Sequence, residues 1–233
     1  MDVEAKEIKK YYSEWWENPK DIRNVVFESL NELVKDRIPP GEGKKALDIG
    51  SGHGRIVSYL LEKGYDVTAV EFNEEFVTEL KIKFPSVKVI AEDVRNVDLD
   101  ETFDLVTCIE FAPLLNETEL VNFLSKIVKV SPLILINMSN RNSLHSTYVK
   151  LRGWQNDFIF DYTPEQFEHL VEEAGFRAVY RRGVGLVTPI SLFRGFKGKF
   201  IPVWFAREVN KLLDTYATKR CHLYYVEAEK VRE

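Results

Sequence analysis

The spacing of apolar residues changes near residue 40. Before that point apolar positions recur at helical intervals and predict helices over 4–17 and 18–38, the second ending at Pro39-Pro40-Gly41. From residue 45 to residue 138, short and almost continuously apolar segments alternate with segments of helical periodicity. Apolar strands that alternate with helices are typical of a parallel sheet covered on both faces. We therefore expect an α/β fold.

The strands of this sheet are bounded by turn and capping residues. Gly64 closes one expected helix, Pro85 stops another, and Asn116 is placed to cap a third. The expected strands are 45–49, 66–72, 87–91, 103–109 and 133–138, and the helices between them are 53–63, 73–84 and the helix that follows Asn116.

The last third departs from this alternation. A polar and aromatic connection is expected first, then helix, strand, irregular segment, helix and strand, an ending that suggests an antiparallel pair at the sheet's edge. The chain has no internal repeat and no low-complexity linker, so we expect a single domain over 1–233, with N-terminal helices in 1–38 and insertions at 139–162 and 183–216. The elements expected here are a helix from Thr163 to Gly175, strands at 176–182 and 222–229, and a helix at 202–216.

Composition narrows the class of protein. The 233 residues are 45% apolar and carry a formal net charge of −5, which gives no general attraction to nucleic acid or anionic lipid. Cys108 and Cys221 both fall in apolar runs, which favours buried free thiols and a reducing compartment. No secretory signal pattern and no run near the roughly 20 apolar residues of a membrane span is present. We expect a cytoplasmic protein without a membrane span.

A glycine-rich turn follows the first expected strand, in the stretch ALDIGSGHGR at 46–55. Gly50, Gly52 and Gly54 follow the pattern G-x-G-x-G. Arg55 occupies the position where the dinucleotide-binding motif G-x-G-x-x-G requires its third glycine, and the sequence Arg55-Ile56 does not provide the Lys-Ser/Thr pair of a phosphate-binding P-loop. Asp48 places a carboxylate at the end of the strand, which suits a ligand that carries positive charge.

Acids also follow the next two strands. Glu71 ends the second strand, where an acid can accept hydrogen bonds from ribose hydroxyls. Asp93 follows the third strand and can accept from an adenine amino group, with Val94 against the ring. The alternative is a purely structural turn beside ordinary loop acids, but such a turn requires no matched set of acids. Ligands of open α/β sheets bind at this edge.

These residues resemble the class I S-adenosylmethionine-dependent methyltransferases, in the small-molecule branch that includes ubiquinone and menaquinone methylases. The segment 48–54 resembles the family's first motif, 103–106 its fourth-strand motif, and 174–176 its late helix-to-strand turn. The resemblance implies a Rossmann-like seven-stranded sheet of order 3-2-1-4-5-7-6, the seventh strand antiparallel, and S-adenosyl-L-methionine as cofactor. The cofactor-binding residues that it implies are Asp48, Gly50, Ser51, Gly52, Gly54, Glu71, Phe72, Asp93, Val94 and Glu110.

Two side chains are candidates for the chemistry. Glu110 follows the fourth strand, near the expected position of the transferred methyl, and is interpreted as a cofactor contact or a base, or alternatively as a surface carboxylate. His145, in the connection after the fifth strand, is a candidate general base, or alternatively a hydrogen-bonded surface histidine. The other histidines do not recur at intervals typical of metal ligands, so we predict no metal site.

Two further segments suggest contacts. Tyr11 lies in an N-terminal helix that is expected to act as a lid and to place an aromatic ring near the cofactor's sulfonium. Residues 192–200 interleave cations and aromatic rings, which suits RNA or an anionic surface, or else an ordinary loop.

The sequence therefore predicts in-line methyl transfer to oxygen, nitrogen or carbon of a small molecule. An RNA methyltransferase that uses 192–200 and a non-catalytic cofactor-binding module are the alternatives. The residues after Glu110 lack the Pro-Pro-aromatic motif of many base N-methylating relatives, which counts against that reaction.

Overall fold

A computed structural model describes residues 24–151, 153, 159–186 and 203–231. The predicted first helix with Tyr11, the N-terminal lid and the segment 192–200 lie outside these residues. Within them, no helix is both long enough and apolar enough to cross a membrane.

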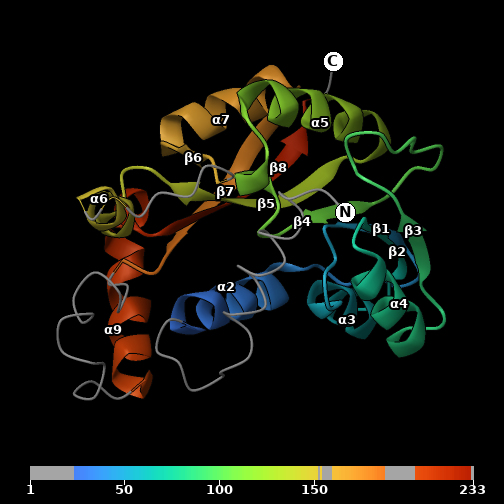
Figure 1. The fold of residues 1–233 in the computed structure, drawn as a ribbon, viewed down its shortest axis with the longest axis horizontal. Helices are drawn as coiled ribbons and strands as arrows, with labels where there is room; N and C mark the ends of the chain where they lie inside the picture. The colour runs from blue at the N-terminus through green and yellow to red at the C-terminus, as the bar shows by residue number, and fades with distance from the viewer. Residues whose placement is uncertain (1–23, 152, 154–158, 187–202, 232–233) are drawn as a thin grey trace. The chain divides into compact units, whose positions relative to one another are not determined.

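One mixed sheet organises the described chain (Figure 1). Its strand order is β3-β2-β1-β4-β5-β8-β7, with the two-residue β6 paired beside β5. The strands are β1 (Lys45–Ile49), β2 (Asp66–Glu71), β3 (Lys88–Ala91), β4 (Leu105–Cys108), β5 (Leu133–Asn140), β6 (Asp161–Tyr162), β7 (Phe176–Val184) and β8 (Leu223–Lys230).

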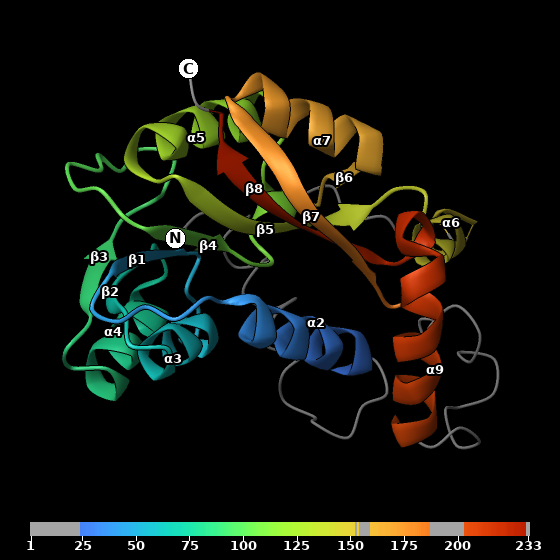
Figure 2. The ribbon, with the colours of Figure 1, turned by 180° about the vertical axis from the view of Figure 1, so that it is seen from behind.

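Strand directions follow from the hydrogen bonds. The pairs among β1 to β5 are parallel. The Asn140 N–H donates to the carbonyl of His222, while the Lys230 N–H donates to that of Pro132, so β8 runs antiparallel to β5, as Figure 2 also shows. Leaving the short β6 out of the count, the order is the predicted 3-2-1-4-5-7-6 with an antiparallel seventh strand. The predicted fold class is confirmed.

Burial explains why these segments form central strands. All four residues of β4 are buried, as are four of the five in β1, in agreement with their apolar runs. Cys108 and Cys221 are both buried and free, as predicted.

Local capping explains where several helices begin. Asn73 accepts a hydrogen bond from the Glu75 N–H at the start of α4, and Asn116 and Glu119 form a capping box on α5. The described helices are α2 (Asn24–Arg37), α3 (Arg55–Glu62), α4 (Glu74–Lys83), α5 (Glu117–Val130), α6 (Leu144–Leu151), α7 (Pro164–Glu173) and α9 (Val203–Tyr216), with 3₁₀ turns η1 (Ala112–Leu114) and η2 (Thr218–Arg220).

The connection predicted over 139–162 differs from expectation. It contains the last residues of β5, the helix α6 and the strand β6, rather than irregular chain alone. Leu144, Tyr148 and Leu151 recur at helical spacing in α6, but the helix has only eight residues, fewer than the window over which helical periodicity is read.

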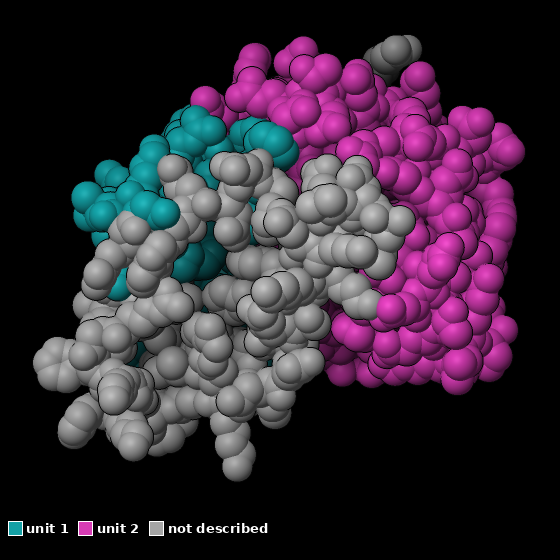
Figure 3. Space-filling model, in the orientation of Figure 1, with its two compact units in different colours: residues 1–33, 139–165, 181–225 teal, residues 34–138, 166–180, 226–233 magenta. Residues whose placement is uncertain are grey.

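Two compact units divide the described chain (Figure 3). One comprises 34–138, 166–180 and 226–233, and contains β1 to β4 with α3, α4 and α5. The other comprises 1–33, 139–165 and 181–225, and contains α6 and α9. The organisation of 1–233 as a single domain stays a prediction.

The unit with α9 is held by polar contacts, of which those of Asp214 are buried. Asp214 is buried and accepts hydrogen bonds from the N–H groups of Gly185 (2.8 Å) and Leu186 (2.7 Å). Arg207 donates to the carboxylate of Glu28, which ties α9 to α2 within this unit. The contacts of Asp214 join the residues that follow β7 to α9.

Gly54 combines two constraints at the start of α3. Its φ is +77°, a left-handed conformation that side chains disfavour. A Cβ at this position would lie 2.3 Å from Cε2 of Phe84 and 2.7 Å from Cδ2 of Leu80. The residue is therefore required by packing as well as by backbone conformation.

We predict that Gly54→Ala lowers the free energy of unfolding by about 2–4 kcal/mol, because backbone strain and overpacking add. Gly43→Ala is the matched control, since Gly43 has a similar φ of +84° but open space around its Cβ position. Its cost should be only about 1 kcal/mol. Chemical denaturation measures both, and equal losses would contradict the packing role of Gly54.

Candidate cofactor-binding site

The glycine loop and two acids meet at the carboxyl edge of the sheet. Asp48 pairs with Ala69 of β2 and with Thr107 of β4 in the parallel register, and Glu71 ends β2. The Gly50 N–H donates to the carbonyl of Val70 at 3.0 Å, so the loop turns back over the end of β2. The register thus brings the loop and the carboxylates to one edge.

Asp48 is a buried carboxylate with only one oxygen satisfied. Its side chain is 2% exposed, and Oδ1 accepts a hydrogen bond from the Thr107 hydroxyl at 2.7 Å. Within the described residues, Oδ2 accepts no hydrogen bond. Burial raises the pKa of Asp48 to about 6, and the Thr107 hydroxyl opposes this shift. A positively charged donor would satisfy the second oxygen and hold the group ionised.

Glu71 links β2 to the glycine loop. Oε2 accepts from the Gly52 N–H at 2.8 Å and Oε1 from the Asn73 N–H at 2.9 Å. Burial raises the pKa of Glu71, while these backbone donors oppose the shift. A carboxylate offers about four lone-pair sites, so each oxygen keeps capacity for a further donor.

Asp93 is held by its near neighbour Arg95. The Arg95 guanidinium contacts both carboxylate oxygens, at 2.6 Å for Nη2 and Oδ2, and the Arg95 N–H donates to Oδ1 at 2.9 Å. Burial alone would raise the pKa of Asp93, but the bonds and charge of Arg95 outweigh it and hold that pKa below its ordinary value. An adenine amino group would therefore share this carboxylate with Arg95.

The loop itself presents open backbone. Gly52 has a φ of +49°, and a Cβ there would meet no atom within 4 Å. Ser51 is buried and its hydroxyl donates to the carbonyl of Asp48 at 3.0 Å. Phe72, next to Glu71 in the chain, is 42% exposed and offers an apolar surface, whereas Val94, next to Asp93, is 6% exposed and therefore buried.

Glu110 follows β4 in a strained conformation. Its φ is +63°, which costs a non-glycine residue about 1–3 kcal/mol unless its surroundings hold it. Its N–H donates to Oδ1 of Asn137 at 2.7 Å, and Nδ2 of Asn137 donates to its carboxylate. Burial raises the pKa of Glu110, while Asn137 and the charge of Arg55 oppose the shift.

Arg55 connects the acids electrostatically. Its guanidinium lowers the pKa of both Asp48 and Glu110. The residue that excluded a dinucleotide motif thus supplies positive charge near the buried carboxylate of Asp48 and the partly buried carboxylate of Glu110.

Thr107 and Asn137 were not identified from the sequence. Each is a fully buried polar residue within an otherwise apolar strand. That interruption of an apolar run was the available signal, because a buried polar side chain needs a partner.

His145 lies in the other unit, at the start of α6. Its ring stacks on that of His222, with centroids 3.9 Å apart. Burial lowers the pKa of His145 to about 4, so its imidazole is neutral near pH 7. A catalytic role for His145 stays a prediction.

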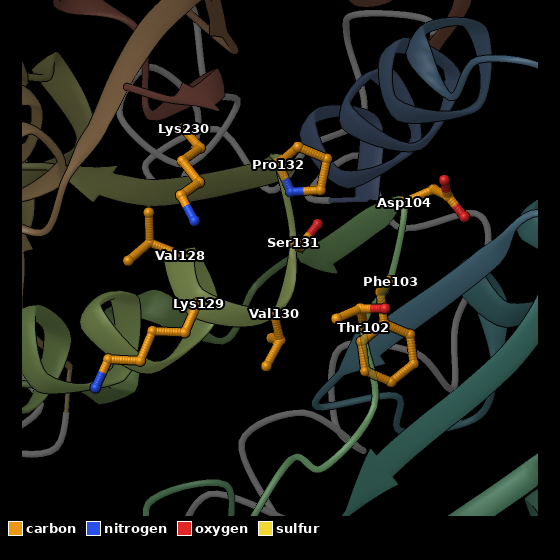
Figure 4. A pocket seen from close by; sticks show the side chains of 9 residues that line it. All are labelled: Thr102, Phe103, Asp104, Val128, Lys129, Val130, Ser131, Pro132 and Lys230. Atoms are coloured by element: carbon orange, nitrogen blue, oxygen red, sulfur yellow. The ribbon is translucent and has the colours of Figure 1, made fainter. Parts of the chain in front are cut away.

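A pocket of about 330 Å³ lies at the opposite edge of the sheet (Figure 4). It is lined by residues 102–104 before β4, residues 128–132 before β5, and Lys230. These are the amino ends of β4 and β5, so the pocket is not part of the glycine-loop site.

Comparison with known proteins agrees with this geometry. Residues 46–131 match a family described as a methyltransferase domain. The matched segment contains Asp48, the glycine loop, Glu71, Asp93 and Glu110.

Relatives with known sequences differ in how much of the chain they match. An uncharacterised protein of Methanocaldococcus jannaschii is 27% identical over 193 residues, 77% of this chain and 79% of its own. The ubiquinone biosynthesis O-methyltransferase of Aliivibrio fischeri is 27% identical over 164 residues, 61% of this chain and 66% of its own. The ribosomal RNA small subunit methyltransferase A of Parabacteroides distasonis is 36% identical over 82 residues, 34% of this chain and 31% of its own.

The fold is shared with solved methyltransferase structures. A SAM-dependent methyltransferase of Archaeoglobus fulgidus superposes with a TM-score of 0.60 at 22% identity, covering 86% of this chain and 94% of its own. The family match therefore identifies residues 46–131, which contain the motif of residues 48–54, as a methyltransferase domain, and the solved structure shows that the chain shares the fold of such enzymes.

Proposed function

We propose that the enzyme methylates a small-molecule acceptor and that Asp48 holds the ammonium group of the cofactor. The observation that carries the cofactor assignment is Oδ2 of Asp48, a buried carboxylate oxygen without a hydrogen bond in the described structure. Leaving such an atom unpaired costs free energy, and an ammonium donor removes that cost.

The remaining contacts follow from the same edge. Glu71 accepts from the ribose hydroxyls with the lone pairs that Gly52 and Asn73 leave. The open Gly52 lets the ligand approach the backbone, and Asp93 accepts from the adenine amino group beside Val94 and Phe72. When bound, S-adenosylmethionine supplies an electrophilic methyl group on a positively charged sulfur.

The chain's own task is to orient the acceptor and exclude water. A proton must be removed only when the acceptor atom carries one that the reaction displaces. Glu110 and His145 are the candidate bases. Burial raises the pKa of Glu110, which makes its ionised carboxylate a stronger base, whereas burial lowers the pKa of His145 to about 4 and makes its imidazole a weaker one.

Several observations support a small-molecule acceptor. The ubiquinone O-methyltransferase similarity extends over 61% of the chain, and the net charge is −5. Glu110-Phe111-Ala112-Pro113 also lacks the Pro-Pro-aromatic motif of many enzymes that methylate nucleic-acid bases.

RNA is the second candidate acceptor. The ribosomal RNA methyltransferase is the more identical relative at 36%, although over only 34% of the chain. The basic and aromatic segment 192–200 offers cations for phosphates and rings for bases.

Asp48→Asn should separate binding from stability. We expect it to weaken S-adenosylmethionine binding about tenfold or more, because the charged partner of the ammonium is lost. It should also stabilise the ligand-free protein at pH 7 by about 1–3 kcal/mol, since it removes a carboxylate whose folded-state pKa is raised. Calorimetry and chemical denaturation measure the two effects. An Asn variant that binds as tightly as the wild type would contradict the assignment.

Cofactor affinity should depend on pH through the same group. Asp48 has a raised pKa of about 6, so it is mostly ionised at pH 7 and mostly protonated at pH 5. If only the ionised form accepts the ammonium well, the Kd for S-adenosylmethionine rises about tenfold from pH 7 to pH 5. Asp48→Asn should flatten most of this change, and an identical pH dependence in the variant would assign it to another group.

Glu71 is tested with a cofactor that lacks a ribose hydroxyl. Glu71→Gln should weaken binding of S-adenosylhomocysteine by about 1–3 kcal/mol through loss of charged hydrogen bonding. A deoxyribose analogue should bind weakly to the wild type, with little further loss in the variant. Fully additive losses in calorimetry would show that Glu71 does not contact that hydroxyl.

The acceptor class is tested with radiolabelled S-adenosylmethionine and a cell extract separated by size. We expect label in the low-molecular-mass fraction, and the same amount after treatment with ribonuclease. Label found only in a ribonuclease-sensitive fraction would favour the RNA acceptor and contradict the small-molecule proposal.

A further inference from the structure

Asn137 is a polar side chain inside the apolar strand β5. It is 0% exposed and stands between Ile136 and Met138. A buried amide is unfavourable unless its polar atoms are paired. Both atoms of this amide serve one residue, because Oδ1 accepts from the backbone N–H of Glu110 and Nδ2 donates to the Glu110 carboxylate.

The paired bonds fix Glu110 at two points. The backbone bond holds a residue with a φ of +63°, and the side-chain bond sets where the carboxylate points. Strained non-glycine residues persist where surrounding contacts determine their conformation, and they cluster at functional sites. Asn137 is the contact that does so from the neighbouring strand.

Glu110 also lies at the glycine loop. The next residue, Phe111, packs against Gly50 so closely that a Cβ on Gly50 would be 2.8 Å from Cδ2 of Phe111. The charge of Arg55 acts on the carboxylates of Glu110 and Asp48 alike. The two carboxylates therefore belong to one site.

The cofactor has two cationic centres, an ammonium and a sulfonium. Under the proposed function, Asp48 takes the ammonium, which leaves the sulfonium without an anionic partner. Glu110 is a partly buried carboxylate that follows β4 beside the loop, and a surrounding of lower dielectric than water strengthens its attraction to positive charge.

We propose that Asn137 is a positioning residue, which holds the Glu110 carboxylate toward the sulfonium so that the site prefers S-adenosylmethionine over S-adenosylhomocysteine. The thioether of the latter is neutral, so the attraction disappears once the methyl group has left. This arrangement favours release of the spent cofactor. The inference rests on the proposed cofactor site and adds to it a role for Asn137 and Glu110, which together distinguish the charged sulfur of one ligand from the neutral sulfur of the other.

The test compares the Kd of S-adenosylmethionine with that of S-adenosylhomocysteine by calorimetry. The wild type should bind the methylated form more tightly. Glu110→Gln, which keeps the shape of the side chain, and Asn137→Leu, which removes both bonds, should each reduce this preference by at least about fivefold. A role confined to folding would weaken both ligands by the same factor.

Asn140→Leu is the matched control. Asn140 lies in the same strand, is 1% exposed, and donates to the backbone carbonyls of Lys219 and Cys221. Its loss should leave the ratio of the two Kd values unchanged. If Asn137→Leu does not fold, Asn137→Ser takes its place, and Glu110→Gln tests the charge independently.

The outcomes are distinguishable. An unchanged ratio in both Glu110→Gln and Asn137→Leu, with both ligands still bound, would overturn the inference and leave the proposed function intact. A changed ratio in Glu110→Gln alone would refute the positioning role of Asn137. Binding of neither ligand to the wild type would overturn the proposed cofactor site and the inference with it.

Discussion

One buried carboxylate connects the fold of this protein to its chemistry. Asp48 lies near the carboxyl end of the central strand β1, where the sheet removes it from water, and the Thr107 hydroxyl satisfies only one of its oxygens. A folded chain keeps such an atom at a cost in stability, as functional sites often do. The parallel register places the acids of β1 and β2 at the same edge, so a ligand that relieves the cost at Asp48 also meets Glu71.

Each carboxylate of the site accepts a hydrogen bond from a donor that holds it in place, and the donor is either neutral or positively charged. Thr107 holds Asp48, backbone N–H groups hold Glu71, Arg95 holds Asp93, and Asn137 holds Glu110. These partners fix the direction of each carboxylate before a ligand arrives. Such preorganisation lowers the cost of ordering the site on binding.

Local signals in the sequence were sufficient to predict most of the helices and strands. Asn116 begins α5 as predicted because a capping box depends on residues three apart, and the buried strands are visible as apolar runs. The helix α6 was missed because its eight residues are too few for helical periodicity to be read with certainty. The partners of the acids were missed for a different reason. Thr107 and Asn137 lie 59 and 27 residues from the groups that they hold, and only the strand register brings them together. The Asp93–Arg95 ion pair is local, but its two residues gave no sign that they would pair rather than face a ligand.

The central claim is that the cofactor's ammonium completes the hydrogen bonding of Asp48. A crystal structure of the protein with bound S-adenosylmethionine measures this directly. We predict that the ammonium nitrogen lies within hydrogen-bond distance of Oδ2 of Asp48, or is joined to it through a single water. A cofactor bound at this edge with its ammonium on other groups, and Oδ2 still unpaired, would contradict it.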